Sequence, residues 1–527
     1  MTPETPTVEM HPQRWGDPAA ATDLPESALG LVDLAFGLQD RPATPGATPP
    51  APGLDDALLD GLRAILGDEH VLVDDATRAL RTRGKSTPDL LRARAGDLGD
   101  APDAVVRPDG QADVERVLAW AQEHRVAVVP FGGGTCVTGG LAARRDGFAG
   151  VVSLDLVRMK RLLAVDEVSM TATLQPGLRG PEAEALLAAH GLTLGHYPQS
   201  FEHASIGGFA ATRSSGQSSA GYGRFDAMVV GLTAATPTGA LDLGSAPANA
   251  AGPDLRQLLL GSEGAFGVIT SVTVRVRRAP AEMTYEGWRW PSFDAGSDAM
   301  RTLAQSGLLP TVIRLSDEAE TAINLADPSS IGGTEDPGCL MITGYEGTAS
   351  QVAASRAAVT AVLSGLGGTA LGTEPGEKWV HGRFGAPYLR DALLDHGVLV
   401  ETLETATFWS NRERLYADVK AALQSSLGEG SLVLCHVSHV YETGCSLYFT
   451  VAARQSDDPL AQWQAAKAAA SDAMIAAGAT ITHHHAVGTD HKPWFAQEIG
   501  EVGVRVLRAV KAELDPTGIL NPGVLIP

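Results

Sequence analysis

The sequence predicts an α+β protein with more than one domain. Its 527 residues exceed the length of one ordinary domain and suit two or three. Short β-branched runs alternate with helical segments between residues 58 and 277, and a second series of strands and helices follows between residues 282 and 480. The apolar fraction, 44%, is typical of a soluble globular protein.

The elements of the first series follow from their patterns. Residues 114–123 (VERVLAWAQE) have the spacing of an amphipathic helix, and the β-branched run 126–129 predicts a strand after it. Further strands are predicted at 150–154, 169–174, 229–235 and 268–276, and the last alternates with period two, as a half-buried strand does. Before this series, residues 42–52 contain five prolines, which predict an extended linker or surface loop.

The second series has its own strands and helices and predicts a second, α/β unit. Strands are expected at 339–344, 397–403, 431–439 and 445–453, helices at 351–363 and 459–476, and a last helix at 495–514. The expected division is an N-terminal segment with the proline-rich linker (1–56), a first domain (57–280), a second domain (281–480) and a C-terminal segment (481–527).

The composition excludes several classes of partner. The formal net charge of −22 argues against nucleic acid and against an anionic membrane surface. No apolar run reaches the ~20 residues that span a bilayer, and the N-terminus shows no basic head followed by an apolar block, so a cytoplasmic protein is expected. The four cysteines, Cys136, Cys339, Cys435 and Cys445, show no CxxC spacing, which excludes a disulfide framework and a structural zinc site.

A glycine-rich loop at residues 131–140 (FGGGTCVTGG) follows the strand VAVVP. Consecutive glycines allow close approach of backbone N–H groups to a ligand, and phosphate is the obvious one. The loop lacks the Lys-Ser/Thr ending of a Walker motif and is not GxGxxG opening a helix. Further Gly/Ser-rich segments lie at 198–208, 212–223 and 261–267. Unrelated turns would account for each segment singly, but the set favours an extended dinucleotide.

The set GGGT (132–135), PQSFEHASIGG (198–208), TRSSG (212–216), ATPTG (235–239) and GSEGAFG (261–267) resembles the FAD-binding domain of the vanillyl-alcohol oxidase / p-cresol methylhydroxylase superfamily. The segments GKSTPDLLRAR (84–94), YLRD (388–391), YETGCSLYF (441–449), HHHAVG (483–488) and DPTGILNPG (515–523) are similar to its alkyl-dihydroxyacetonephosphate synthase branch. The resemblance implies a two-subdomain FAD-binding domain, a cap domain that binds substrate, and a C-terminal helical segment that completes the active site.

The resemblance also implies where FAD binds, without a covalent bond. Cys136 stands where relatives have serine, so a flavin–cysteine bond remains an alternative to a small buried thiol. The cofactor-binding residues that it implies are Pro130, Phe131, Gly132, Gly133, Gly134, Thr135, Cys136, Pro198, Gln199, Ser200, Ala204, Ser205, Gly207, Gly208, Thr212, Arg213, Ser214, Ser215, Gly261, Glu263, Gly264, Gly267 and Ile269.

Tyr441 matches a tyrosine that the synthases use as acid–base. A phenol is neutral near pH 7, so this role requires nearby cations that lower its pKa, and His436, His439 and the triple-histidine run are the candidates. The alternative is a buried tyrosine in a core hydrogen-bond network.

Arg390 matches a substrate-contacting arginine of that branch, and Arg314 falls where the family has a second essential arginine. Guanidinium groups bind phosphate or carboxylate bidentately. The alternative is ordinary ion pairs, of Arg390 with Asp391 or Asp395 and of Arg314 with Asp317.

The run His483, His484 and His485 raises the question of a metal. If residues 481–485 form a strand, His483 and His485 face one side and His484 the other. A metal would need a third ligand, and the nearest carboxylate is Asp490. Metal binding therefore stays the alternative. The resemblance implies a metal-free cluster that polarises the substrate and shuttles a proton with the tyrosine.

The implied activity is exchange of an acyl for an alkyl group on a ketone phosphate, with flavin N5 trapping the substrate carbon. The alternative is an FAD-dependent oxidase or dehydrogenase of a 2-hydroxy acid or alcohol, since the same residues serve both. A third hypothesis, flavin binding without catalysis, is disfavoured by the intact set of tyrosine, arginine and histidines. The expected partner is a small molecule bearing phosphate or carboxylate, and a homodimer is possible in this family.

Overall fold

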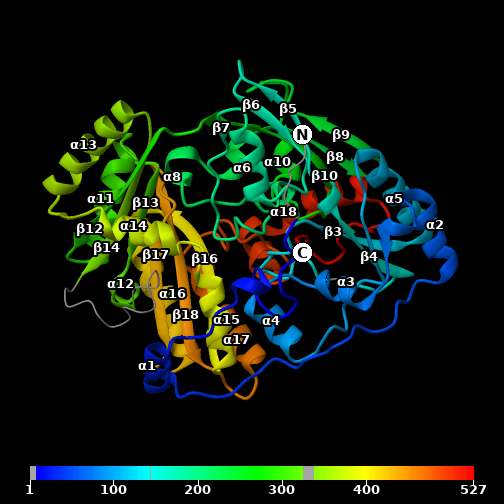
Figure 1. The fold of residues 1–527 in the computed structure, drawn as a ribbon, viewed down its shortest axis with the longest axis horizontal. Coiled ribbons are helices and arrows are strands. Elements are labelled where there is room, and N and C mark those ends of the chain that lie inside the picture. The colour runs from blue at the N-terminus through cyan, green and yellow to red at the C-terminus, as the bar shows by residue number, and fades with distance from the viewer. Residues whose placement is uncertain (1–6, 143, 324–337) are drawn as a thin grey trace.

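The computed structural model of the chain describes residues 7–142, 144–323 and 338–527. Its strands gather in two regions (Figure 1), with sheets A and B built from the first half of the chain and sheet C from the second. The strands of sheet A, in spatial order, are β1 (Val71–Leu72), β2 (Ala104–Val106), β4 (Gly150–Asp155) and β3 (Val126–Phe131). Those of sheet B are β5 (Leu162–Asp166), β6 (Thr171–Leu174), β10 (Val268–Arg275), β8 (Val229–Thr236) and β9 (Gly239–Leu243). Those of sheet C are β15 (Thr369–Gly372), β12 (Glu282–Trp290), β14 (Cys339–Gly347), β13 (Val312–Ser316), β17 (Leu432–Val437), β18 (Gly444–Arg454) and β16 (Val398–Phe408).

Helices flank these sheets, and β7 (Leu192–Thr193) pairs with β11 (Arg277–Arg278) beside them. Around sheets A and B lie α2 (Asp56–Leu66), α3 (Asp75–Leu80), α5 (Gln111–His124), α6 (Gly180–Ala188), α7 (Ile206–Thr212), α9 (Phe225–Met228) and α10 (Arg256–Leu259). Helices α4 (Thr87–Arg94) and α8 (Ser219–Tyr222) contact sheet C, at β16 and β13 respectively. With sheet C come α1 (Glu26–Phe36), α11 (Phe293–Gln305), α12 (Glu318–Ile323), α13 (Ala349–Gly365), α14 (Glu374–Gly382), α15 (Ala386–Asp395), α16 (Arg412–Leu427) and α17 (Pro459–Ala476), and α18 (Lys492–Leu514) follows. The predicted α+β architecture is confirmed.

Sheets A and B differ in strand direction. In sheet A, β2, β4 and β3 run parallel, with Val128 opposite Val152 in β4. Sheet B is antiparallel between each of its described strand pairs. Helix α5 places Val117 and Leu118 in the same buried cluster as Val128, which explains the apolar spacing of the segment VERVLAWAQE.

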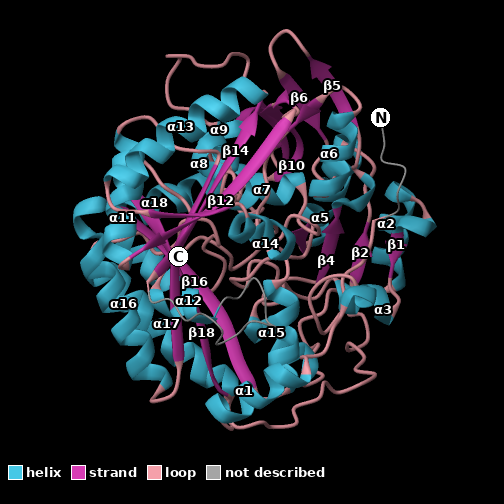
Figure 2. Cartoon of the chain, turned by 60° about the vertical axis from the view of Figure 1, so that its left-hand side comes forward, coloured by secondary structure: helices cyan, strands magenta, loops and turns pink. Residues whose placement is uncertain are grey.

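Sheet C divides its two faces between a core and a cavity. Along β18, Leu447, Phe449 and Val451 are fully buried in the core that includes residues of helices α11, α13, α16 and α17. The alternate residues Tyr448 and Thr450 line a cavity. Figure 2 shows α16 and α17 beside β16 and β18. Each described strand pair of this sheet is antiparallel, so the strands and helices of the second region form no parallel βαβ unit there.

The strand expected at residues 481–485 does not form, and this prediction was wrong. Only Thr480 makes a bridge, to Ala406 of β16, and the three histidines lie in a loop. The strand expected at 431–439 also ends earlier, at Val437, so His439 lies outside it. The predicted tail helix begins at Lys492, and its backbone is non-helical at Gly500.

The proline-rich segment is extended, as predicted, and connects helices that pack in different halves of the molecule (Figure 1). Helix α1 packs Phe36 against Val400 of sheet C. Further along, the carbonyl of Pro50 accepts a hydrogen bond from Arg78 Nη2 at 2.6 Å, and Gly53 N donates to Asp103 at 2.6 Å. The segment is therefore attached to the first half of the chain and is more than a tether.

The C-terminus returns to sheet A. Ile519 and Leu520 are fully buried in the cluster around β3, and Leu520 forms a parallel bridge with Val128. Asp515 holds this segment by accepting hydrogen bonds from the backbone N–H groups of both residues, at 3.1 and 2.8 Å. This segment thus completes the core around sheet A.

Leu520→Ala should lower the free energy of unfolding by about 2–5 kcal/mol, since it leaves a cavity in a closely packed core. Denaturant unfolding followed by tryptophan fluorescence measures the change. Val168→Ala is the control, because Val168 is 97% exposed and should change stability by less than about 0.5 kcal/mol. Equal stability of the Leu520 variant and wild type would show that the C-terminal segment does not contribute to this core.

Candidate active site

A cavity of about 760 Å³ lies between the glycine-rich segments of the first half and the open face of sheet C. Its size is that of a cofactor or small-molecule site. One wall consists of residues from the loop after β3, from the start of α7 and from the segment before β10, and the opposite wall of residues from β13, β16, β17 and β18. Of the predicted cofactor residues, the cavity is lined by Pro130, Gly132, Gly133, Gly134, Thr135, Cys136, Pro198, Gln199, Ser200, Ala204, Ser205, Gly207, Gly208, Thr212, Ser214, Ser215, Glu263, Gly264, Gly267 and Ile269.

Phe131, Arg213 and Gly261 do not line the cavity. The Phe131 ring lies beneath the guanidinium of Arg81, 5.0 Å from its carbon. Arg213 turns away to donate to the carbonyl of Leu260 at 2.9 Å. These residues support the wall from behind.

The loop after β3 packs directly on the segment that enters α7. A Cβ on Gly133 would lie 2.6 Å from Ala204 Cα, closer than two carbon atoms approach without displacement. Arg179 holds the other side of this contact, because its Nη1 donates to the carbonyl of His203. Only glycine therefore fits at position 133, and its backbone forms the cavity wall.

Cys136 is a neutral thiol. Burial raises its pKa to about 11, and the nearby Glu263 carboxyl acts in the same direction. Its Sγ accepts a hydrogen bond from Gly140 N at 3.2 Å. Because the thiolate is the nucleophilic form of cysteine, this environment favours the packed-thiol alternative over a bond to flavin.

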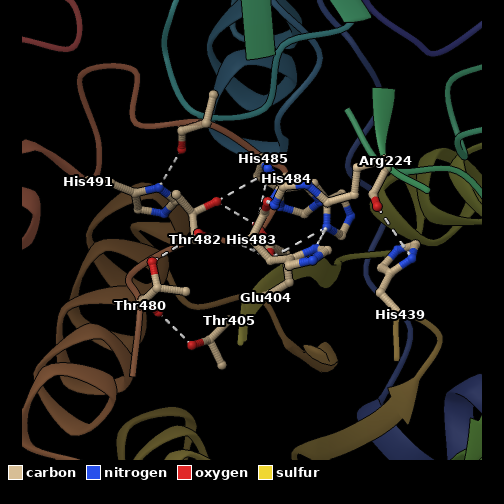
Figure 3. Close-up of polar contacts among 12 residues, drawn as sticks. Arg224, Glu404, Thr405, His439, Thr480, Thr482, His483, His484, His485 and His491 are labelled. Carbon is tan, nitrogen blue, oxygen red and sulfur yellow. Dashed lines mark hydrogen bonds and ion pairs between the residues drawn. The ribbon is translucent and has the colours of Figure 1, made fainter. Parts of the chain in front are cut away.

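Glu404, on β16, holds the histidine loop (Figure 3). Its carboxylate accepts hydrogen bonds from Thr482 Oγ1 at 2.6 Å and from the backbone N–H groups of His483, His484 and His485 at 2.6, 3.1 and 2.9 Å. Burial would raise the pKa of Glu404, but the adjacent histidines and Thr482 hold it well below its ordinary value. These N–H groups are the ones that a strand would need for its ladder, which explains why no strand forms.

Glu263 holds the same loop at its other end. Its carboxyl accepts from Val487 N at 3.1 Å and from Gly488 N at 2.9 Å. Burial raises the pKa of Glu263 to about 7. Asn521 Nδ2 donates to the carbonyl of Glu263 at 2.6 Å, which ties the C-terminal segment to the same point. Acidic residues from both halves of the chain thus position the histidines.

The hydrogen bonds of Tyr441 lead from the cavity to the protein surface. Its hydroxyl lies 2.5 Å from His483 Nε2, and His483 Nδ1 lies 2.9 Å from His484 Nδ1. His484 and His485 line the cavity, whereas His483 and Tyr441 do not, and Tyr441 is 36% exposed. Tyr441, His483 and His484 therefore form a chain with one end at the cavity and the other at solvent.

The expected lowering of the tyrosine pKa is contradicted. Burial raises the pKa of Tyr441 to about 12, despite the nearby Arg224. Burial also lowers the pKa of His483 to about 4 and lowers those of His436 and His439, so these imidazoles are neutral. The histidines do not supply the positive charge that the sequence interpretation required.

Arg390 combines an ion pair with a free donor. Its Nε donates to Asp391 Oδ1 at 3.2 Å and its Nη1 to the carbonyl of Lys85 at 2.8 Å. Its Nη2 is buried without a hydrogen-bond partner in the described residues, and the residue lines the cavity. The predicted pair with Asp391 forms, whereas Asp395 pairs with Arg14 and Arg94. The free donor is suited to an anionic ligand.

Arg314 pairs with Glu320 and not with Asp317, which corrects that alternative. Its Nη2 also lies 3.0 Å from His436 Nδ1. Burial would raise the pKa of Glu320, but Arg314 and His436 lower it to about 2. Arg314 therefore enters the cavity wall with its charge compensated by Glu320, whereas Arg390, which also has an ion pair, keeps a free Nη2 donor.

The residues that hold the site were not predicted from the sequence. Glu404 had one signal in the sequence, because it is an acidic residue directly after the apolar strand GVLVETL (397–403). Glu401, inside that strand, shows the same signal. Glu320 had none, because a buried ion pair between β13 and α12 leaves no spacing pattern. Lys85 lies in the quoted segment 84–94, but nothing there predicted that its carbonyl holds Arg390. Sequence analysis also paired His483 with His485, whereas the structure brings His483 to His484 and to His439.

Comparison with known proteins identifies the family. Residues 102–243 match the family described as "FAD binding domain" and residues 279–525 the family "FAD linked oxidases, C-terminal domain". The chain is 34% identical over 521 residues to an alkyldihydroxyacetonephosphate synthase of Trypanosoma brucei brucei, covering 92% of this chain and 84% of the relative. It is also 34% identical to the enzyme of that name from Dictyostelium discoideum, covering 88% and 80%.

A solved structure titled alkyldihydroxyacetonephosphate synthase superposes with a TM-score of 0.85 at 31% identity, and 98% of each chain is covered. Among the described residues, no helix is long and apolar enough to cross a membrane. The paired family matches, the identity over most of both chains and the shared fold lead to one conclusion: this chain belongs to the alkyldihydroxyacetonephosphate synthase family of FAD-dependent enzymes.

Proposed function

We propose that the chain exchanges the acyl group of an acyl-dihydroxyacetone phosphate for a long-chain alkoxide, a transferase step of ether-lipid synthesis. The observation that carries this proposal is the mixed lining of one cavity. Glycine-rich backbone and Arg390 line it, and so do α1 residues such as Val32 and Phe36, which pack with apolar residues of sheet C. A small 2-hydroxy acid would need the polar part only, whereas a substrate with a phosphate and a long alkyl chain needs both.

FAD fits the glycine-rich wall of this cavity. The backbone around Gly133 and the hydroxyls of Thr135 and Ser205 supply hydrogen-bonding groups for a dinucleotide. When bound, the flavin would supply an electrophilic N5 that accepts the substrate carbon and releases it again, with no net oxidation. Arg390 is our candidate for the substrate phosphate, through its free Nη2. Arg314, paired with Glu320, would polarise the substrate at the wall.

The proton released in the exchange can be carried by the hydrogen-bond chain from His484 to Tyr441. The incoming alcohol loses its hydroxyl proton, and the acyl group leaves as a carboxylate, so the reaction releases one proton. His484 at the cavity can accept it, and His483 and Tyr441 connect His484 to the exposed side. His485 completes this wall beside Tyr448, with ring centroids 5.4 Å apart. A phenol with a raised pKa can relay a proton without a lasting charge.

The test is a product assay with the FAD-loaded protein. With an acyl-dihydroxyacetone phosphate and a long-chain alcohol, we expect an alkyl ether and one free fatty acid per turnover, with no oxidised product. Anaerobic bleaching of the flavin by a 2-hydroxy acid, with no ether formed, would replace the proposal with a dehydrogenase. A homodimer and a cytoplasmic location also remain predictions, which light scattering and cell fractionation address.

Gly133→Ala should reduce FAD affinity by about tenfold or more, because the added Cβ displaces the loop from Ala204 at a cost above ~1.4 kcal/mol. Flavin content after gel filtration and titration of the apoprotein with FAD measure the change. Gly110→Ala is the matched control, since a Cβ there meets nothing within 4 Å. Normal FAD binding by the Gly133 variant would remove this loop from the proposed site.

FAD should leave the protein on acid denaturation, because Cys136 is a neutral thiol and forms no bond to flavin. Precipitated protein should be colourless and the supernatant yellow, and Cys136→Ser should behave identically and keep its FAD while folded. Flavin that stays with the wild-type precipitate and leaves the serine variant would establish the covalent bond instead.

Tyr441→Phe should lower turnover by about 10²-fold or more while FAD binding is unchanged, because it removes the outer group of the proton chain. Steady-state product formation and the flavin absorption spectrum measure the two effects. Tyr222→Phe removes a hydroxyl that bonds Glu346 at 2.7 Å and does not reach the cavity, so it serves as control. Wild-type turnover in the Tyr441 variant would refute its role.

A further inference from the structure

Three histidines from two segments of the chain converge beside the cavity. His439 lies just after β17, and His483 and His484 belong to the loop held by Glu404 (Figure 3). One ligand atom of each lies within 4.8 Å of those of the other two. The histidine run by itself lacks a third ligand, and His439, 44 positions before His483, offers one. With this third imidazole the site does not require a carboxylate ligand.

Two of the three rings have an outer contact through one nitrogen, which leaves the other nitrogen for an ion. His439 is held through Nδ1 by Ser215 Oγ at 3.4 Å, and His483 through Nε2 by Tyr441 at 2.5 Å. Metal-binding histidines commonly use one nitrogen for such an outer contact and the other for the ion. The His439 and His483 rings lie nearly parallel with centroids 5.0 Å apart, and His484 stands edge-on to both.

One of the three nitrogen–nitrogen distances requires little rearrangement, and the ligand atom of His439 lies within 4.8 Å of the other two. His483 Nδ1 and His484 Nδ1 are 2.9 Å apart. Zinc–nitrogen bonds of about 2.0–2.1 Å at tetrahedral angles place ligand nitrogens about 3.3 Å apart. The pair would open by about 0.4 Å, and the hydrogen that the two Nδ1 atoms share would move to Nε2 of the same ring. His439 and His484 line the cavity, so a fourth position would face it.

The charge of a cation would also be compensated. Glu404 is 2% exposed, and in the described part of the chain its ion pair is with His484 Nδ1, at 3.5 Å. Its remaining contacts in that part of the chain are neutral N–H and O–H donors. The negative charge of this carboxylate, which also interacts with Arg224, would attract a cation at the three imidazoles.

We propose that His439, His483 and His484 form a binding site for a divalent transition-metal ion of the Zn²⁺ class, and that the bound ion inhibits the enzyme. Three imidazoles select zinc and its neighbours over Mg²⁺ or Ca²⁺, which prefer oxygen ligands. An ion at the two Nδ1 atoms replaces the hydrogen that they share and so interrupts the chain from His484 to Tyr441. The inhibitory part rests on the proposed function, whereas the binding part does not.

The experiment uses full-length, FAD-loaded protein and Zn²⁺ alone as the probe. Protein is equilibrated with Zn²⁺ buffered by a competing chelator, and bound zinc is measured by elemental analysis. Wild type should bind one zinc per chain. His439→Gln should bind it at least about 100-fold more weakly, since losing even an outer partner of a ligand costs 10–100-fold. His381→Gln, which changes an exposed histidine on α14, should bind like wild type.

The same samples test inhibition. Zinc should lower the turnover of wild type, and added chelator should restore it. The binding site is refuted if wild type binds no zinc, or if His439→Gln binds it as tightly as wild type. Should His439→Gln not retain FAD, His484→Gln is measured for zinc binding in its place, with the same two outcomes. Unchanged or higher turnover with zinc bound refutes inhibition. Zinc stoichiometry needs no substrate, so this result is separable from failure of the proposed activity.

Discussion

The buried carboxylate of Glu404 is the constraint on which the site depends. A charged group in the protein interior is tolerated only when its hydrogen-bonding capacity is satisfied, and here a hydroxyl and three consecutive backbone N–H groups do so. Those N–H groups are then unavailable to a β-ladder, so the loop of three histidines curls around one side chain of β16. The orientation of the imidazoles follows from this arrangement, including the approach of His483 to His484.

The loop also connects the two halves of the molecule. Glu404 belongs to sheet C, whereas Glu263 lies before β10 of sheet B and accepts the N–H groups of Val487 and Gly488. Asn521 connects the C-terminal segment to the same loop region, because its Nδ2 donates hydrogen bonds to the carbonyls of Gly140 and Glu263. The wall that fits FAD and the wall with the ionisable residues are therefore held at a set distance by hydrogen bonds that converge on one loop.

Sheet C provides the other half of the design through simple alternation. Residues of one face enter a core with the helices, and their immediate neighbours face the cavity. Period-two patterning thus assigns Tyr448 and Thr450 to the cavity while Phe449 stabilises the fold. Helix α1 covers part of this face with apolar side chains, which explains how one cavity combines a polar and an apolar lining.

Local pattern was sufficient for most of the fold and for the cofactor wall. Periodicity predicted the helix of residues 459–476 and the strands β3, β4, β8 and β10 at their observed positions. It could do so because hydrophobic spacing depends only on residues that are close in the sequence. Most glycine-rich segments meet at the cavity for a similar reason, since close backbone approach requires glycine whatever the partner. By itself the sequence determined the α+β class and the family, and it predicted the glycine-rich segments that line the cavity. Only the tertiary structure decided that the histidine run is a loop, that Tyr441 remains a neutral phenol at the solvent end of a hydrogen-bond chain, and that His439 joins His483 and His484. The physical reason is that burial, pKa and the convergence of ligands depend on contacts between residues far apart in the chain, such as Glu404 with the backbone of residues 483–485.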